Sequence, residues 1–414
     1  MKTKELKESR SNLDVFLAEF DDCIKTVNSR QHLRTYTGGQ LSDLERKSVE
    51  PIALEAGVPP RSLQEFLAIH RWEEDRVRLR VQDVVKRDHA DDNAIGVIDE
   101  TSFPKKGDKT AGVQRQYCGA TGKTDNCVVT VNLGYTAGDF HTLVDTDLYL
   151  PKETWDEDRE RCREAGIPDD VVYRPKWRIA LDLMERTINN GIRFKWLTAD
   201  ELYGGCGEFR RGVADMGMHY VVEVPCSTSG WLRRPPILGP GDGAGIGRPR
   251  TRVALSPKAP APSRVDALWL RGGPSWEAFH IKDTEKGPVV WEVRIGDIYV
   301  TEDRFPPEKR HLIVARNVLD GEIKYFLSDA PWDTSVEILL HVAFTRWRIE
   351  RLFEDAKGQV GIDHFEVRQY RPLMRHMILS MVSLLFLMRE TKRLRGKKYL
   401  VERATGAPRR RCTA

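Results

Sequence analysis

The spacing of apolar residues changes near residue 94, and this change constrains the fold more than any other feature of the chain. Residues 1–90 carry helical spacings, such as the stripe formed by Leu13, Phe16 and Phe20. The next apolar runs are rich in β-branched residues and bounded by turn residues: AIGVID (94–99), CVVTVNLGYT (127–136) and FHTLVDTDLYL (140–150). The sequence therefore predicts an α-helical N-terminal domain over residues 1–90, followed by strands.

Helical and strand patterns then alternate, which predicts an α/β core. Residues 173–192 have helical spacing, residues 194–200 form an apolar strand-like run, and residues 209–225 fit a helix followed by a strand. We assign residues 91–225 to the first part of this core.

The middle of the chain interrupts the core. Residues 225–263 contain eight Pro and six Gly, a composition that disfavours regular structure. Residues 276–331 alternate apolar and polar side chains between turn signals, as antiparallel strands do. We therefore predict that residues 226–331 form a linker and a mainly antiparallel β insertion.

Helical spacing returns after residue 333. Residues 335–361 predict one long amphipathic helix, and residues 371–394 predict a strongly apolar core helix. We assign residues 332–395 to the second, helical part of the core and residues 396–414, which are rich in Lys and Arg, to a basic C-terminal tail.

A possible helix-turn-helix lies at residues 47–70. Two short helical patterns flank Gly57, where the left-handed backbone conformation is easily reached. In a helix-turn-helix the second helix enters the major groove, which would direct Arg61 and Gln64 at DNA. An ordinary αα-hairpin that packs on the rest of the domain fits the same pattern, so both interpretations remain open.

Composition excludes several classes of protein. A chain of 414 residues predicts two to four domains, and no apolar run of 18 residues is present to span a bilayer. The charged start lacks the apolar core of a secretory signal, so we expect a cytoplasmic protein without a membrane partner. Seven scattered cysteines give no CxxC pair and no disulfide framework. The net charge of +4 permits a polyanionic partner without establishing one.

Three carboxylates stand where an α/β core makes side chains converge. Asp99 ends the first strand pattern, Asp200 ends the fourth, and Glu350 lies within the helix predicted at 335–361. Carboxylates that follow apolar strands lie at the carboxyl edge of a sheet, where open α/β sheets build sites. Each residue taken singly also fits a helix cap, a turn residue or a solvated helix charge.

The block RWRIERLFEDAK gives these carboxylates a context. Arg346 precedes Glu350 by four residues and Lys357 follows it by seven, offsets that return to one face of an α-helix. With these intervals the chain resembles the DDE-type insertion-sequence transposases, in the branch whose catalytic Glu lies in a Tyr-Arg-Glu-Lys signature. The Tyr of that signature falls on Ala343 here. The resemblance covers about residues 40–395.

The resemblance implies a ribonuclease-H-like core, a mixed sheet flanked by helices and interrupted by a β insertion. In that family Asp99, Asp200 and Glu350 would be catalytic and would hold two Mg²⁺ ions, for which Mn²⁺ can substitute. Arg346 and Lys357 would hold DNA phosphates. The partners implied are double-stranded DNA, as terminal inverted repeats and target, and a second copy of the chain in a homodimer, in a bacterial, nucleoid-associated setting.

Basic and aromatic residues add further candidates. Lys105, Lys106 and Arg115 follow the first strand and would contact DNA phosphates, although lysines are also common in exposed loops. Trp332 precedes the helix of Glu350, and in the resembling branch such an aromatic stacks on a flipped base. Trp276 and Trp291 are further candidates, and a core role is an alternative for each of the three.

Two other functions remain open from the sequence. One is an endonuclease of the same fold that does not transfer strands. The other is a DNA-binding regulator derived from a transposase. The presence of Asp99, Asp200, Glu350, Arg346 and Lys357 together favours an enzyme, because a regulator has no need for all five.

Overall fold

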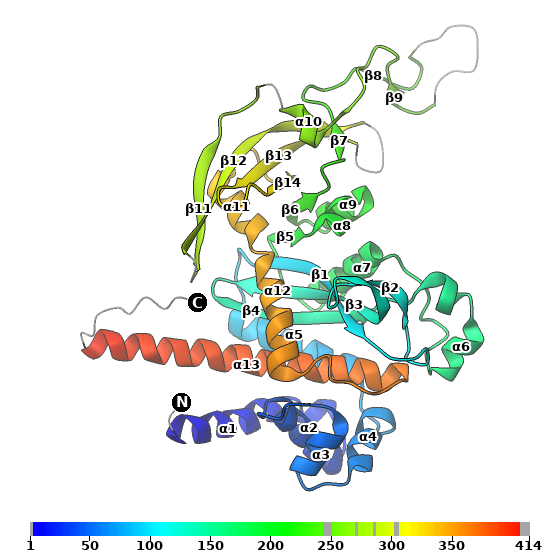
Figure 1. Ribbon diagram of the computed structural model, residues 1–414, viewed down its shortest axis with the longest axis vertical. Coiled ribbons are helices and arrows are strands. Elements are labelled where there is room, and N and C mark those ends of the chain that lie inside the picture. Colours follow the sequence, from blue (N-terminus) through cyan, green and yellow to red (C-terminus); the bar gives the residue numbers. More distant parts are fainter. Residues whose placement is uncertain (1–2, 243–250, 270–271, 285–286, 302–305, 406–414) are drawn as a thin grey trace. The chain divides into compact units, whose positions relative to one another are not determined.

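A computed structural model describes residues 3–242, 251–269, 272–284, 287–301 and 306–405 (Figure 1). The chain divides into two compact units. Unit 1 comprises the described residues of 1–193 and 347–409, and unit 2 comprises those of 194–346. The unit boundaries therefore lie at 193/194 and 346/347, whereas the sequence placed the β insertion between 226 and 331. The N-terminal helices share unit 1 with the first strands.

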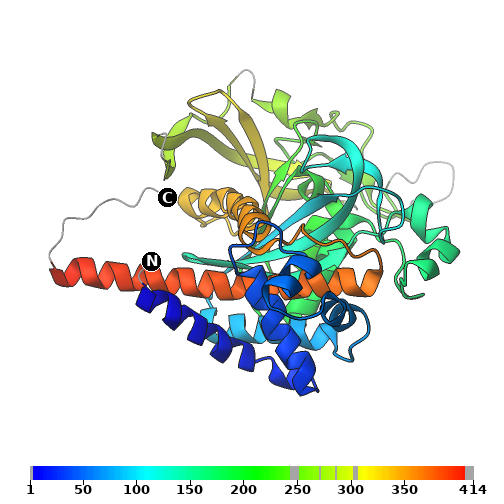
Figure 2. The same ribbon diagram turned by 60° about the horizontal axis from the view of Figure 1, so that its bottom comes forward.

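Unit 1 begins with the predicted helices. They are α1 (Thr3–Ala18), α2 (Val27–Gln40), α3 (Val49–Glu55), α4 (Pro60–Ala68) and α5 (Glu74–His89). The side chain of Thr26 caps α2 by accepting a hydrogen bond from Ser29 N, and Pro60 supplies a favourable first residue to α4. Helices α1, α2, α4 and α5 pack against α13 (Tyr370–Thr405), which runs beside the N-terminal helices in Figure 2.

Helices α3 and α4 have the outline predicted for residues 47–70. The turn between them contains Gly57 at φ +67°, and the inward residues Ile52, Leu63 and Phe66 are buried. Helix α3 also approaches α2 closely, since a Cβ at Gly39 would collide with Ile52 Cγ2. A helix-turn-helix and an αα-hairpin share this geometry, so contact with DNA remains a prediction.

Four antiparallel strands form the sheet of unit 1: β1 (Ile95–Pro104), β2 (Gln114–Cys118), β3 (Lys123–Ala137) and β4 (Phe140–Leu148). Strand β3 pairs with each of the others. Strand β2 was not predicted from the sequence. After β4 the chain forms a π-helical turn (Lys152–Asp156), α6 (Arg159–Glu164) and α7 (Lys176–Asn189).

Helices cover both faces of this sheet. On one face, α7 provides Arg186, whose guanidinium contacts the buried carboxylate of Asp145 on β4 at 2.8 Å. On the other, α12 (Trp347–Asp355) packs so closely that a Cβ at Gly134 would lie 3.5 Å from Ile349 Cδ1. Unit 1 is therefore a helix–sheet–helix arrangement.

Helix α13 is the apolar helix predicted at 371–394. By length and composition, residues 370–396 are apolar enough to cross a membrane, which the sequence analysis did not anticipate. However, 89% of the most apolar window is buried inside the protein, so this segment is a core helix. The helix continues to Thr405, and the predicted boundary between core and tail at 395/396 falls within it. Residues 406–414 lie outside the described residues.

Unit 2 contains a mixed sheet. Strand β5 (Trp196–Ala199) runs parallel to β6 (His219–Val224), with α8 (Glu201–Gly204) and α9 (Gly207–Asp215) between them. Antiparallel strands continue from β6, in the spatial order β14 (Ile323–Ser328), β13 (Glu308–Asn317), β12 (Gly287–Val300) and β11 (Glu277–Thr284). The antiparallel strands predicted for residues 276–331 are thus confirmed.

The linker contains little regular structure in its described parts. Its elements are β7 (Ser229–Gly230), β8 (Ile237–Leu238), β9 (Ala254–Leu255), β10 (Ser263–Arg264) and α10 (Val265–Leu268). Residues 243–250, which include two of its arginines, lie outside the described residues.

The single long helix predicted at 335–361 is wrong. Helix α11 (Val336–Phe344) ends before Thr345, α12 begins at Trp347, and a π-helical turn (Ala356–Val360) follows. At the break, Thr345 Oγ1 donates to His341 O at 2.6 Å, and the Thr345 amide is shared between the carbonyls of His341 and Val342. Back-bonding of a Thr hydroxyl to the carbonyl four residues earlier bends a helix, and apolar spacing does not register it.

Candidate active site

Asp99 lies in the middle of a strand, not at its end. Strand β1 continues to Pro104, and Asp99 pairs with Asn132 of β3. Asp99 therefore does not lie at the carboxyl edge of a sheet, and that prediction is wrong. Its side chain is half-buried, and Oδ1 accepts a hydrogen bond from Glu100 N at 2.7 Å.

The alternation of β1 separates Asp99 from its neighbour Glu100. Glu100 faces α7, where Lys176 Nζ lies 2.7 Å from its carboxylate. Val97 and Asp99 face the other way, and Val97 pairs with Gly134, over which Ile349 of α12 packs. Asp99 therefore belongs to the face of the sheet that α12 covers.

Glu350 lies on that covering helix. The preceding residue, Ile349, is fully buried against the sheet, whereas Glu350 is exposed. Helix α12 contacts β1 directly. Unit 1 thus brings the helix of Glu350 to the strand face of Asp99, although 250 residues separate the two in sequence.

Asp200 belongs to unit 2 and caps a helix. It follows β5, as predicted, and its Oδ1 accepts hydrogen bonds from Leu202 N at 3.0 Å and Tyr203 N at 3.4 Å at the start of α8. The helix-cap interpretation left open by the sequence therefore applies to Asp200. The three predicted carboxylates are divided between the two units.

The signature around Glu350 is divided in the same way. Arg346 lies at the break before α12, in unit 2, where its Nε is 3.8 Å from Glu223 Oε2 of β6. Lys357 lies in the π-helical turn after α12, in unit 1, and is half-buried. Because no continuous α-helix joins the three residues, the argument that offsets of −4 and +7 share one helix face is wrong.

The predicted phosphate-binding residues after β1 differ in their surroundings. Lys105 Nζ donates to Phe365 O at 2.7 Å and lies 3.3 Å from the centre of the Phe365 ring. Burial lowers the pKa of Lys105 to about 8. Lys106 and Arg115, by contrast, are exposed. The ammonium of Lys105 is therefore engaged within the protein, while the other two side chains face solvent.

Among the three candidate tryptophans, Trp332 is the exposed one. Trp332 is 52% exposed, with Lys309 Nζ 4.0 Å above its ring and the His311 ring at 4.1 Å. Trp291 is buried against Phe344, which confirms the core alternative for it. Trp276 lies against the guanidinium of Arg294.

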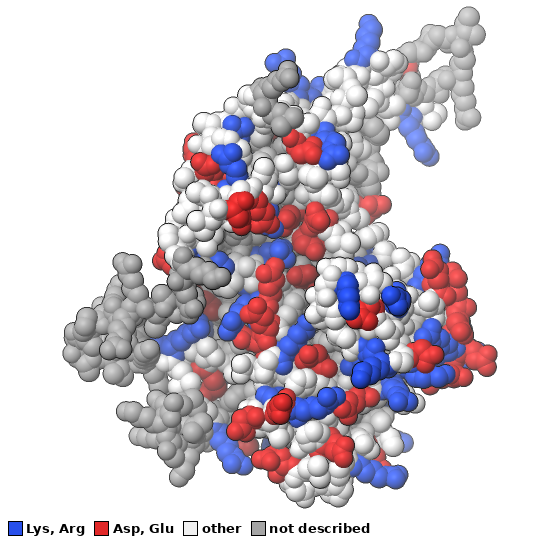
Figure 3. All heavy atoms as spheres, viewed as in Figure 1, with Lys and Arg blue, Asp and Glu red and all other residues white. Residues whose placement is uncertain are grey.

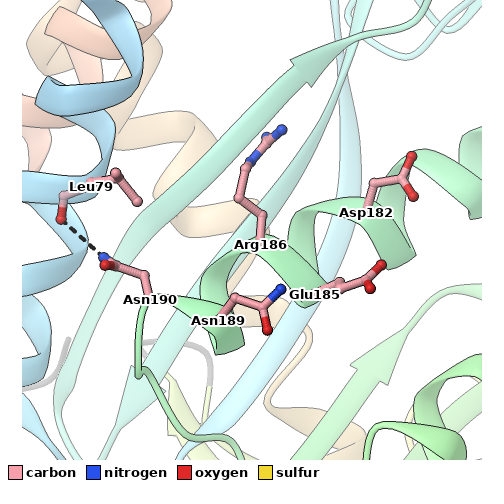
Figure 4. Close-up of a pocket in the computed structure, with 6 residues that line it drawn as sticks. All are labelled: Leu79, Asp182, Glu185, Arg186, Asn189 and Asn190. Atoms are coloured by element: carbon pink, nitrogen blue, oxygen red, sulfur yellow. Dashed lines mark hydrogen bonds between the residues drawn. The ribbon is translucent and has the colours of Figure 1, made fainter.

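A cavity on the described part of unit 1 lies away from the predicted carboxylates. This cavity of about 520 Å³ lies between α5 and α7, on the sheet face opposite α12 (Figure 4). On the face of the molecule shown in Figure 3, Lys and Arg are interspersed with Asp and Glu. The cavity between α5 and α7 is lined by Leu79, Asp182, Glu185, Arg186, Asn189 and Asn190.

The donor chemistry fits a hard divalent cation. Asp99, Asp200 and Glu350 offer only carboxylate oxygens, which Mg²⁺ and Mn²⁺ prefer. Within the described part of the chain, no three His, Cys, Asp or Glu side chains are grouped so that they could hold a metal ion.

Comparison with known proteins decides the family. Residues 19–288 match the family of DDE superfamily endonucleases. The chain belongs to this family. The segment of this chain that matches the DDE family includes Asp99 and Asp200, while Glu350 lies beyond it. The resemblance inferred from the sequence is confirmed. As a class, DDE endonucleases cleave nucleic acid and use divalent metal ions.

A relative within the DDE family has a more specific description. The chain is 31% identical over 215 residues to the "Probable transposase for insertion sequence element IS701" of Microchaete diplosiphon. The alignment covers 51% of this chain and 53% of that protein, so this chain spans about half the length of its curated relative.

Sequence reasoning missed buried polar residues near the predicted site residues. Asn132, the strand partner of Asp99, is fully buried and accepts a hydrogen bond from Thr146 Oγ1 at 2.8 Å. A polar amide inside the apolar run CVVTVNLGYT was the available signal. Lys47 and His376, whose contacts are described below, gave no local signal.

Proposed function

We propose that this protein is a DNA transposase. It binds the terminal inverted repeats of its element, cleaves the DNA ends and joins the 3′ ends to target DNA. The observation that carries the proposal is the packing of α12, with Glu350, on the β1 face that holds Asp99. Membership of the DDE family and the likeness to a probable transposase support it. The core would then be ribonuclease-H-like.

The carboxylates are the proposed metal ligands. Asp99, Asp200 and Glu350 would together hold two Mg²⁺ ions, or Mn²⁺ in their place. When bound, such ions activate an attacking oxygen and stabilise a leaving oxygen in phosphoryl transfer. This arrangement requires Asp200 of unit 2 to join the two carboxylates of unit 1.

Cationic side chains are the proposed DNA contacts. Arg346 and Lys357 would hold phosphates at the reacting strand through charge-assisted hydrogen bonds. The exposed Lys106 and Arg115 would contact the backbone farther along the duplex. Lys105 is the weakest of the predicted phosphate ligands, because its ammonium already binds Phe365 O.

Other parts of the chain have proposed roles in the same reaction. The exposed face of α4, with Arg61 and Gln64, would read the terminal repeats. The exposed ring of Trp332 is available for base stacking. Pairing two ends would take two copies of the chain, and the reaction would occur on the bacterial nucleoid in the cytoplasm.

Strand cleavage and joining test the proposal directly. Purified protein is incubated with labelled terminal-repeat DNA, a target plasmid and Mg²⁺, and the variants Asp99→Ala, Asp200→Ala and Glu350→Ala are compared with wild type. Each should lose cleavage and joining. Glu354→Ala is the matched control, since Glu354 is an exposed carboxylate on the same helix, 3.3 Å from Arg351.

The other outcomes separate the alternatives. Cleavage without joined products would indicate an endonuclease, and specific binding without cleavage would indicate a regulator. If the three variants cut as well as wild type does, the assignment of the carboxylates is wrong. Footprints of full-length Arg61→Ala and Gln64→Ala, compared with wild type, test the proposed reading helix.

A further inference from the structure

The segment that follows α12 is held by three titratable side chains. The carbonyl oxygens of Gln359, Ile362 and Phe365 accept hydrogen bonds from Lys47 Nζ, His376 Nε2 and Lys105 Nζ, respectively. The last two donor–acceptor distances are 3.0 and 2.7 Å. The donors come from the loop before α3, from α13 and from the end of β1. We call these three side chains the carbonyl clamp.

Lys47 makes the most extensive contacts of the clamp. It is only 5% exposed, and its ammonium also donates to Gln40 O at 3.0 Å. Its backbone amide donates to His364 Nδ1 at 2.9 Å. Desolvation lowers the pKa of Lys47, and such burial is tolerated only where carbonyl oxygens replace water.

The backbone of the segment is shaped to fit Lys47. Gly361 has φ +74°, and a Cβ at that position would lie 2.8 Å from Lys47 Cβ. A side chain there would be strained and would also collide with the clamp. The turn and the lysine are therefore fitted to each other.

The other two members hold the segment at Ile362 and Phe365. His376 is fully buried, accepts from Tyr36 Oη at 2.8 Å through Nδ1 and donates through Nε2, an assignment that follows from its partners. Burial lowers the pKa of His376 to about 4, so the ring is neutral at physiological pH. Lys105 adds a cation–π contact with the Phe365 ring.

We propose that the carbonyl clamp positions Lys357 for phosphate binding next to Glu350. Lys357 lies in the π-helical turn, two residues before Gln359, whose carbonyl Lys47 holds. Lys47 and His376 are positioning residues in this proposal, because they act on the backbone that carries Lys357 and not on DNA. Lys47 also precedes α3, so it joins the proposed DNA-reading helices to the end of the proposed catalytic helix. The inference rests on the proposed function.

A double-mutant cycle in the full-length chain tests the clamp. The rate of single-turnover cleavage is measured for Lys47→Met, Lys357→Ala and the double variant on saturating terminal-repeat DNA with Mg²⁺. We expect Lys47→Met to slow cleavage by roughly tenfold to a hundredfold, as small misplacements of catalytic groups do. The double variant should be no slower than Lys357→Ala, because Lys47 acts through Lys357.

The controls distinguish positioning from general damage. Arg46→Met alters the neighbouring residue, whose guanidinium lies 2.5 Å from Glu366 in an exposed pair, and should leave the rate unchanged. Equal rates for Lys47→Met and wild type, or losses that multiply in the double variant, would overturn the inference. If Lys47→Met does not fold, Lys47→Gln, which keeps a donor among the carbonyls but shortens its reach, tests the same segment in the same cycle. A wild-type protein that cuts no terminal-repeat DNA would instead refute the proposed function.

Discussion

Replacing Asp145 should destabilise unit 1 more than any surface substitution. The Asp145 carboxylate is completely buried on β4, with Arg186 of α7 at 2.8 Å and Arg78 of α5 at 3.1 Å. Burial raises the pKa of Asp145, and the two guanidiniums oppose this shift. The charged cluster therefore joins two helices to the sheet face opposite α12.

The structure sets the expected size of the effect. Removing one member of a buried ion pair costs about 3–5 kcal/mol, because the remaining charge loses its partner. Asp145→Asn leaves Arg78 with a side chain only 9% exposed, whereas Arg186, at 33%, can be solvated. We therefore expect a loss near the lower value, about 3 kcal/mol, which lowers the melting temperature of a domain of roughly 250 residues by about 6–12 °C.

Calorimetry and urea unfolding measure this loss. Asp83→Asn serves as control, because Asp83 and Lys86 form an exposed pair and should contribute less than about 1 kcal/mol. Replacing Asp145, Arg78 and Arg186 together by Leu and Met should recover most of the stability, since no buried charge is left unpaired and Asp75, the second partner of Arg78, is exposed. The reasoning is refuted if Asp145→Asn is no less stable than the control.

Three further predictions concern the sheet, the clamp and the metal. Lys105→Met should remove a pH dependence of stability. Between about pH 8 and the ordinary pKa of 10.5, the unfolded wild type binds a proton at Lys105 that the folded protein has lost. The free energy of unfolding of the wild type should therefore rise relative to that of the variant as the pH is raised above 8, as measured by urea unfolding at pH values below and above 8. Gly134→Ala should be tolerated, since its Cβ would make an ordinary 3.5 Å contact with Ile349, whereas Gly134→Leu should displace α12, cost about 1–3 kcal/mol and slow cleavage. A chelator should abolish DNA cleavage but leave DNA binding intact in a gel mobility-shift assay. Loss of both cleavage and binding would contradict the assignment of the metal to catalysis.

The spacing of apolar residues predicted the helices and strands that bury one face. The strands β1, β3 and β4, the helix α7 and the antiparallel insertion all follow from local spacing, because an apolar face has to meet a core. The exposed strand β2 was missed because its sequence, QRQYC, has only one fully buried residue. Strand β1 was ended too early because DETS reads as polar, although its backbone remains paired with β3.

The candidate site depended on contacts that spacing does not encode. The sequence supplied Asp99, Asp200 and Glu350 through a family signature, but it did not reveal that a helix break at Thr345 divides the signature. The sequence predicted a DNA contact for Lys105 because this residue follows the strand of Asp99. Its actual partner, Phe365, is 260 residues away in sequence.

The dependence of the N-terminal helices on α13 has a consequence for synthesis. Tyr36 and Gln40 bind His376 and Ser380, partners that the ribosome adds 340 residues later. Until then the N-terminal helices lack the apolar helix that fills their core, so an isolated fragment of residues 1–90 should not fold stably. A prematurely terminated chain would therefore be a substrate for proteases, and it would not compete with the complete protein for DNA.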